Sequence, residues 1–172
     1  MNKNMVGKFM KVSRKIFIES LDECMTPNLC FDKDKSDTYE NIKLPKRATK
    51  FSAGYDFFLP FGIHLEPNET CKIPTGIRVK IDESWVLMCF PRSGLGFKYG
   101  MRLINTVGII DSDYFMSDNE GHIFLKITNG SDKTLQLMKG DAFAQGIFLP
   151  YGITEDDDVD TVRNGGMGST SK

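Results

Sequence analysis

The chain has 172 residues, a formal net charge of −1 and 40% hydrophobic residues. This length suits one domain with tails, and the apolar content is sufficient for a core. The near-zero net charge excludes a global field that would attract nucleic acid or an anionic membrane. Any phosphate binding must therefore come from local groups of residues.

The four cysteines form no C-x-x-C pair, which favours reduced thiols in a cytoplasmic protein. The two histidines, His64 and His122, are too few and too distant to complete a zinc site. No stretch approaches the roughly 20 apolar residues of a membrane span. The basic start of the chain has no apolar segment or small-residue cleavage site, so we expect no secretory signal.

Residues 1–42 differ in their residue pattern from the rest of the chain and are expected to form an N-terminal extension. Within it, the short apolar patch Lys15–Ile18 is expected to be an edge strand. The polar and acidic tract Phe31–Glu40 is expected to be a loop. No segment longer than ten residues keeps a helical period, and the only helical turn expected lies near Ser93–Tyr99.

Residues 43–152 are expected to form an all-β core. Short β-branched or aromatic runs alternate there with Gly, Pro, Asn and Asp, and prolines stand at the strand boundaries. Many short strands at this spacing are typical of a sandwich, jelly roll or barrel. The expected strands are 55–59, 61–65, 71–73, 76–81, 85–90, 101–105, 107–110, 122–128, 134–137 and 142–149.

Residues 153–172 are expected to form a flexible C-terminal arm. The segment Glu155–Asp158 is acidic, and Arg163–Thr170 is rich in glycine, so the arm has too little apolar content to fold alone. Glycines let backbone amides approach an anion, Ser and Thr add donors, and Arg supplies a bidentate fork. The tail therefore suits phosphate binding, and the alternative interpretation is a disordered tail.

A second candidate for phosphate binding is Pro91–Gly96, which follows an apolar strand. The proline ends that strand, and Ser93 with Gly94 can open a helical turn. Backbone N–H groups of such a turn, with a hydroxyl and an arginine, form a small anion nest. The alternative is an ordinary strand-to-turn junction with a surface arginine.

The run Asn105–Tyr114 reads as a strand, a bend at a glycine, a second apolar strand, an acidic pair and a tyrosine. The bend exposes peptide groups that can read the edge of a flat polar ligand. Asp111, which directly follows the apolar pair, can polarise a water molecule as a general base. The alternative is a plain hairpin with a solvated aspartate turn and a core tyrosine.

With two weaker segments, Ala53–Asp56 and Phe143–Gln145, these runs resemble in order the five motifs of the trimeric dUTPase (deoxyuridine triphosphate nucleotidohydrolase) family. The resemblance spans about residues 43–170, and its second and third motifs are highly specific. The tract Asn119–His122 is similar to the version found in Gram-positive bacteria and their phages. The resemblance implies a distorted jelly-roll (β-clip) protomer in a homotrimer. Each active site would be lined by two subunits and closed by the arm of the third.

The implied reaction is hydrolysis of dUTP to dUMP and pyrophosphate, with Mg²⁺ held mainly by the triphosphate. Asp111 would accept the proton of the attacking water, and Asp56 would act on Mg²⁺ through water. Uracil and deoxyribose would contact Asn105, Gly108, Ile109, Ile110, Tyr114, Phe124 and Met167. The phosphates would contact Arg92, Ser93, Gly94, Gln145, Arg163, Gly168, Ser169 and Thr170.

The sequence departs from the family pattern in four places. Met167 stands where the family usually has Phe, Ala142 where it usually has Arg or Lys, and Ser171 where the fifth motif usually ends in Gly. Phe115–Glu120 lengthens the loop after the third motif. Two alternatives stay open. One is a related dCTP deaminase, which would need a glutamate base and would lack the glycine-rich arm. The other is a nucleotide-gated binding protein, whose partner would contact residues 1–42 or 115–120.

Overall fold

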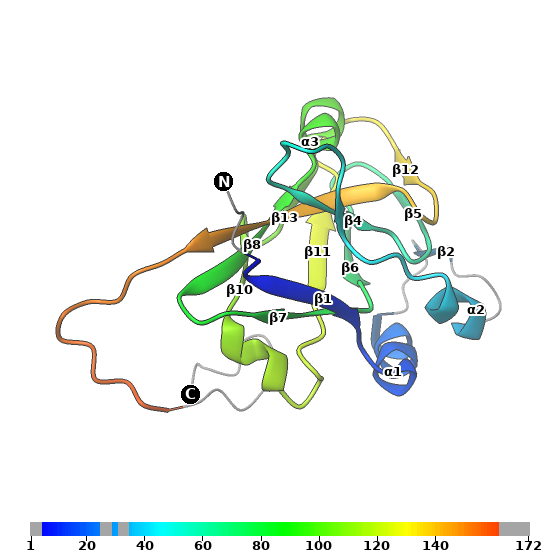
Figure 1. Cartoon of the computed structure of the whole chain (residues 1–172). Helices are drawn as coiled ribbons and strands as arrows, with labels where there is room; N and C mark the ends of the chain where they lie inside the picture. The colour runs from blue at the N-terminus through cyan, green and yellow to red at the C-terminus, as the bar shows by residue number, and fades with distance from the viewer. Residues whose placement is uncertain (1–4, 25–28, 31–34, 162–172) are drawn as a thin grey trace.

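The computed structural model describes residues 5–24, 29–30 and 35–161, which form thirteen strands, three α-helices and one 3₁₀ helix (Figure 1). The largest sheet has five strands, and every pair of neighbours in it is antiparallel. Its order is β10 (Gly108–Ile110), β8 (Trp85–Pro91), β13 (Ala142–Pro150), β4 (Tyr55–Phe58) and β3 (Lys46–Arg47).

Three smaller antiparallel sheets complete the described architecture. One contains β6 (Thr70–Pro74), β11 (Phe124–Thr128) and β9 (Arg102–Leu103); another contains β12 (Leu135–Leu137), β5 (Gly62–Leu65) and β2 (Leu29–Cys30); the last pairs β1 (Gly7–Lys11) with β7 (Ile77–Ile81). Strands alternate between buried and exposed positions, as the two-residue side-chain period requires. In β7, for example, Ile77, Val79 and Ile81 are buried while Lys80 is exposed.

The expected all-β core is confirmed. Each of the ten strands expected between residues 55 and 149 is present within two residues at either end, and α3 (Ser93–Tyr99) forms where a helical turn was expected. The strands build a jelly-roll type of fold, with one apolar core shared by the sheets. Patterned alternation with proline and glycine at the boundaries was therefore sufficient to predict this part of the chain.

The expectation for the N-terminal extension was wrong in two places. Lys15–Ile18 is not an edge strand, because it belongs to α1 (Arg14–Cys24). The helix buries Phe17, Leu21 and Cys24, and the spacing of these three residues by four and three follows the helical period. The tract expected as a loop contains α2 (Lys35–Glu40), and β1 was not expected at all.

The end of the described chain leads away from the core after β13 (Figure 1). Residues 153–161 are exposed and contain neither strand nor helix. The glycine-rich part of the expected arm lies outside the described residues. Within the described part of the chain, no helix is both long and apolar enough to cross a membrane.

Candidate functional site

The first cluster of predicted site residues lies where β4, β13 and β8 are neighbours. Gln145 in β13 is paired with Asp56 of β4 on one side and with Phe90 of β8 on the other. Arg92 follows β8 directly, and its Nε atom lies 3.4 Å from Oδ1 of Asp56. The Gln145 amide Nε2 donates to the carbonyl oxygen of Pro91 at 3.3 Å. Three motifs from separate parts of the sequence therefore meet in one place.

Charge and exposure in this cluster suit an anionic ligand. The Asp56 side chain is 15% exposed while the Arg92 side chain is 44% exposed, so the guanidinium is the more accessible partner of this ion pair. Ser93 and Gly94 follow in the first turn of α3, and both are exposed. Their backbone N–H groups have no carbonyl partner within the helix, as at any helix start. We call Asp56, Arg92, Ser93, Gly94 and Gln145 the phosphate cluster.

A metal ion would find few protein ligands here. Among the residues that the structure describes, no group of three His, Cys, Asp or Glu side chains could hold a metal ion. Asp56 supplies one carboxylate to the phosphate cluster, and that carboxylate already faces Arg92. Mg²⁺ prefers octahedral oxygen ligands and commonly uses few carboxylates with substrate phosphates and water. The cluster fits such an ion only when a phosphate ligand brings most of the oxygens.

The second group of predicted residues lies on the turn that joins β9 to β10 and on β10 itself. Thr106 adopts a positive φ of 66°, and its N–H donates to the Leu103 carbonyl at 3.0 Å. Asn105 is exposed at this tight turn. Gly108 packs against β8 so closely that an added Cβ would lie 3.3 Å from Cβ of Cys89. The glycine thus lets β10 approach β8, and the turn presents the Asn105 side chain to solvent.

β10 is an edge strand of the described five-stranded sheet. Gly108 and Ile110 are buried, whereas Ile109 is 49% exposed. An edge strand presents unpaired peptide N–H and C=O groups on the side away from its neighbour. Those groups can form hydrogen bonds with the edge of a flat polar ligand.

Phe124, at the start of β11, lies beside this turn. A cavity of about 240 Å³ is lined by Asn105, Phe124, Ile104, Lys72 and Lys126. The Lys72 ammonium lies 4.2 Å from the centre of the Phe124 ring, a cation–π contact. The structure therefore brings together Asn105 and Phe124, which were both predicted to contact the nucleoside.

Asp111 and Tyr114 belong to the turn that follows β10. Asp111 is exposed, has extended backbone and precedes the 3₁₀ helix η1 (Ser112–Met116); its carbonyl accepts the Tyr114 N–H at 3.2 Å. Tyr114 is only 1% exposed. Its hydroxyl donates to the His122 carbonyl at 2.7 Å and accepts the Asn119 amide at 2.9 Å. Tyr114 thus has its hydroxyl engaged within the protomer and lines a second cavity, of about 230 Å³, with Phe124 and His122.

His122 had no predicted role beyond its exclusion as a zinc ligand. It is fully buried, and burial lowers the pKa of its imidazole to about 3. Its Nε2 accepts the Gly76 N–H at 2.8 Å, and its ring lies 4.3 Å from that of Phe124. In the sequence, His122 directly precedes the apolar residues that lead into β11. That position was the signal that could have predicted a buried histidine. The neutral ring therefore supports the backbone on which Tyr114 and Phe124 lie.

The two groups of residues lie at opposite ends of β8. Ile110 is paired with Leu87, so Asp111 lies near the start of β8, while Arg92 follows its end. Arg92 stands five positions after Leu87, which corresponds to about 17 Å at the usual strand rise of 3.3 Å per residue. Within one protomer, the candidate general base is therefore remote from the phosphate cluster.

The predicted site residues of the arm lie outside the described residues. These are Arg163, Met167, Gly168, Ser169 and Thr170.

A family model described as dUTPase matches residues 40–171. The chain belongs to the dUTPase family. A deoxyuridine 5'-triphosphate nucleotidohydrolase of Lactococcus lactis is 39% identical over 137 residues, covering 77% of this chain and 91% of that relative. The structure of dUTPase from Streptococcus mutans is 35% identical, with a TM-score of 0.61 over 77% of this chain and 96% of that one. The predicted family is confirmed, including its likeness to Gram-positive members.

A dUTPase from Staphylococcus bacteriophage 80alpha shares the fold at 20% identity, with a TM-score of 0.63. The likeness covers 92% of this chain and 98% of that one. Because this coverage exceeds the share of the chain that follows residue 42, the fold shared with this phage dUTPase includes part of residues 1–42. The N-terminal residues are thus similar in fold to part of a phage dUTPase.

Proposed function

We propose that this chain hydrolyses dUTP to dUMP and pyrophosphate. The observation that carries the proposal is the tight turn at Asn105 and Thr106 with the edge strand β10, which is followed by the exposed residue Asp111. Peptide groups that can read a base and an acid that can activate water are adjacent there. Membership of the dUTPase family supports the same reaction.

Base selection would depend on the unpaired peptide groups of β10 and on the Asn105 amide. Uracil presents an acceptor, a donor and an acceptor along O2, N3–H and O4, and Gly108, Ile109 and Ile110 would complement this pattern. Cytosine presents a donor in place of O4, which would leave buried groups unpaired. Such mismatches discriminate by roughly 10⁴–10⁵-fold. Phe124 would close the pocket from β11, and Met167 would cover the base from the arm.

Tyr114 would contact the deoxyribose with its ring. The engagement of its hydroxyl by Asn119 and His122 supports this role, because it fixes the ring beside the cavity that Phe124 also lines. A fixed aromatic wall leaves no room for a 2′-hydroxyl. Rejection of ribonucleotides would then need no charged sensor.

Phosphate binding would fall to the phosphate cluster. Arg92 would neutralise phosphate charge, while Ser93, the Gly94 amide and Gln145 would donate hydrogen bonds. When bound with the triphosphate, Mg²⁺ would neutralise its charge, and Asp56 would contact its water shell. Asp111 would accept the proton of the attacking water, a role worth typically about 10²–10⁴-fold in rate.

The complete site would need more than one subunit. The separation of about 17 Å along β8 between Leu87, the partner of Ile110, and Arg92 supports a site in which Asp111 of one subunit meets the phosphate cluster of another. We therefore propose a homotrimer with three shared sites. Residues 1–42 would be the extension and 43–152 the core. Residues 153–172 would be the arm that closes a neighbouring site, with Arg163, Gly168, Ser169 and Thr170 on the phosphates. Its proposed location is the cytoplasm.

The test is pyrophosphate release from dUTP with Mg²⁺, comparing wild type with Asp111→Asn. Asn keeps the size of the side chain and its backbone preference but cannot accept the proton, so we expect kcat to fall about 10²–10⁴-fold. Thermal unfolding should stay within about 2 °C of wild type, since Asp111 is exposed. Equal rates would remove Asp111 from the mechanism. Release of ammonia from dCTP would instead indicate the deaminase alternative.

A further inference from the structure

We call the turn from Asp111 to Tyr114 the catalytic turn, after the role proposed for Asp111. The N-terminal segment Gly7–Cys24 contains β1 and α1. It contacts the loop that follows the catalytic turn. The Ser13 N–H, at the start of α1, donates to Oε2 of Glu120 at 2.7 Å. The same carboxylate oxygen lies 3.7 Å from Nη1 of Arg78, and both side chains are largely shielded, at 31% and 21% exposure. A residue 107 positions away in sequence therefore fixes the start of α1.

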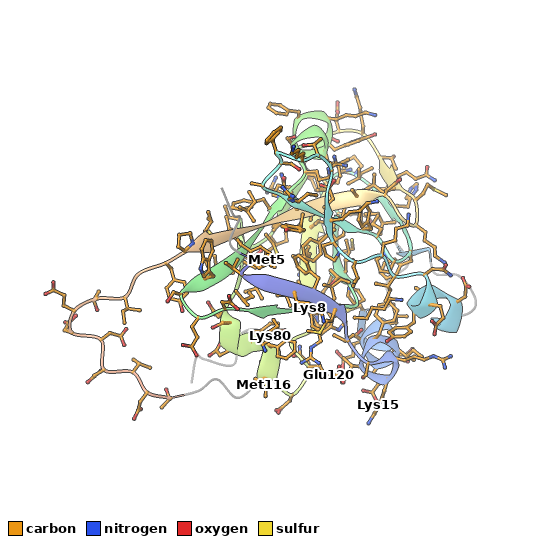
Figure 2. All side chains as sticks on the ribbon, in the orientation of Figure 1. Met5, Lys8, Lys15, Lys80, Met116 and Glu120 are labelled. Atoms are coloured by element: carbon orange, nitrogen blue, oxygen red, sulfur yellow. The ribbon has the colours of Figure 1, made fainter. Side chains whose placement is uncertain are left out.

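The loop 115–120 is held at its other end as well. Nη2 of Arg78 donates to the Phe115 carbonyl at 2.8 Å, and the guanidinium lies 3.8 Å from the centre of the Phe115 ring. Figure 2 shows Glu120 between Lys15, near the start of α1, and Met116, in η1. One arginine of β7 thus contacts both ends of the loop, and the N-terminal segment contacts one of them.

From this loop, hydrogen bonds lead directly to Tyr114. The Asn119 amide donates to the Tyr114 hydroxyl at 2.9 Å, and its Oδ1 accepts the Gly121 N–H at 3.2 Å. Gly121 has a φ of 68°, and an added Cβ would lie 2.7 Å from the Tyr114 carbonyl oxygen. Because Tyr114 and Asp111 share one hydrogen-bonded turn, the position of the loop fixes the position of both.

A second path joins the N-terminal segment to the same tyrosine. The Val12 N–H donates to the Gly76 carbonyl at 3.0 Å, and the Gly76 N–H donates to His122, whose own carbonyl accepts the Tyr114 hydroxyl. The Phe17 ring lies 6.3 Å from the ring of His122. The cavity that Tyr114 and Phe124 line is also lined by four residues of α1, namely Ile16, Glu19, Ser20 and Glu23.

We propose that the N-terminal segment is a positioning element for the catalytic turn, and that Glu120 is the positioning residue through which it acts. The proposal rests on dUTP hydrolysis by this chain, because Asp111 and Tyr114 act only in that reaction. Glu120 is not among the residues assigned to the substrate. It holds the start of α1 against the loop, and the loop holds the turn that carries the general base.

The test compares Glu120→Ala with Glu120→Gln. Glu120 has a φ of 58°, so both variants keep the same backbone strain and differ only in the side chain. Alanine removes the acceptor for the Ser13 N–H, and we expect kcat for dUTP to fall about tenfold. KM should change less than twofold, because Glu120 contacts Ser13 and Arg78 and no residue of the phosphate cluster. Glutamine keeps an oxygen that accepts the Ser13 N–H, so its kcat should recover to within threefold of wild type.

The matched control is Asp118→Ala, which removes an exposed carboxylate from the same loop and should leave kcat within twofold. Amide hydrogen exchange of residues 112–116 should quicken in Glu120→Ala and stay unchanged in Asp118→Ala. A wild-type kcat in Glu120→Ala, or an equal loss in Glu120→Gln, would overturn the proposal. If the wild-type chain released no pyrophosphate from dUTP, the proposed function would fail, and the exchange comparison would still decide whether Glu120 holds the turn.

Discussion

Gly54 offers a way to disturb the phosphate cluster without removing any of its residues. It precedes β4 and faces the side chain of Gln145. A Cβ added at Gly54 would lie 2.5 Å from Oε1 of Gln145, whereas real Cβ atoms essentially never approach another heavy atom within 3.0 Å. In Gly54→Ala the Gln145 amide must therefore move by at least about 0.5 Å, and an ordinary contact needs about 1 Å.

The expected effect on stability is small and the effect on catalysis is large. The atom that must move is Oε1, at the far end of the flexible Gln145 side chain. Moving this amide breaks the 3.3 Å hydrogen bond from Gln145 to the Pro91 carbonyl. Losing one such hydrogen bond costs about 1 kcal/mol. A misplacement of about 1 Å in a group that orients substrate costs up to about 100-fold in rate. We expect kcat/KM to fall about 10–100-fold while the melting temperature falls by about 2–4 °C.

The assay is a double-mutant cycle on kcat/KM for dUTP, read by pyrophosphate release. If Gly54→Ala acts through Gln145, it should add almost nothing to Gln145→Ala. Gly152→Ala serves as the control, because no atom lies within 4 Å of its added Cβ. A Gly54→Ala enzyme with wild-type kcat/KM, or one that loses a further tenfold on the Gln145→Ala background, would refute the reasoning.

Two further predictions follow from buried titratable groups. The pKa of His122 is lowered to about 3 by burial, so the unfolded chain binds a proton that the folded chain rejects. The free energy of unfolding should therefore fall as pH drops from about 6.5 toward 3, by up to about 1.4 kcal/mol per pH unit from this residue. Urea titrations of His122→Gln should show a shallower fall of the unfolding free energy with pH. Equal slopes in the variant and the wild type would contradict a neutral buried ring. Burial raises the pKa of the Cys71 and Cys89 thiols to about 12. Iodoacetamide at pH 8 should therefore label neither thiol until urea unfolds the chain. Labelling of these two cysteines in the folded protein at the rate seen in the unfolded chain would contradict this prediction.

The core strands were predictable because each one carries its own pattern. In β11, Leu125 and Ile127 are buried while Lys126 is exposed, and the segment lies between Gly121 and Gly130. A half-buried strand shows this alternation wherever its partners lie in sequence. The same holds for β7 and β6, whose bounds were expected within a residue.

α1 was missed because its apolar residues are interrupted by charged ones. The apolar patch within Lys15–Ile18 resembles a short strand, whereas Phe17, Leu21 and Cys24 lie on one helix face. The Oγ of Ser13 accepts the Ile16 N–H at 3.3 Å, which is an N-cap. A serine followed by apolar residues at helical spacing was the signal that would have predicted the helix.

The contacts within the candidate site could not be predicted from linear motifs. Arg92 and Asp56 stand 36 positions apart in sequence, and they meet because β13 lies between β4 and β8. No local pattern encodes that strand order, since register and neighbours depend on the packing of the whole sheet. The motifs therefore indicated candidate site residues, and the fold decides which of them face one another.

The two additions to the dUTPase core that the sequence presents separately form one structural unit. Residues 1–42 and the loop 115–120 were each expected to be an independent extension or partner surface. The Ser13–Glu120 hydrogen bond and the contacts of Arg78 with Phe115 and Glu120 join them. The loop follows Tyr114 directly. A change in the N-terminal segment therefore reaches the catalytic turn through Glu120 and Asn119 rather than through the whole sheet. A lengthened loop beside the general base would be free to move if nothing held it, and α1 supplies what holds it.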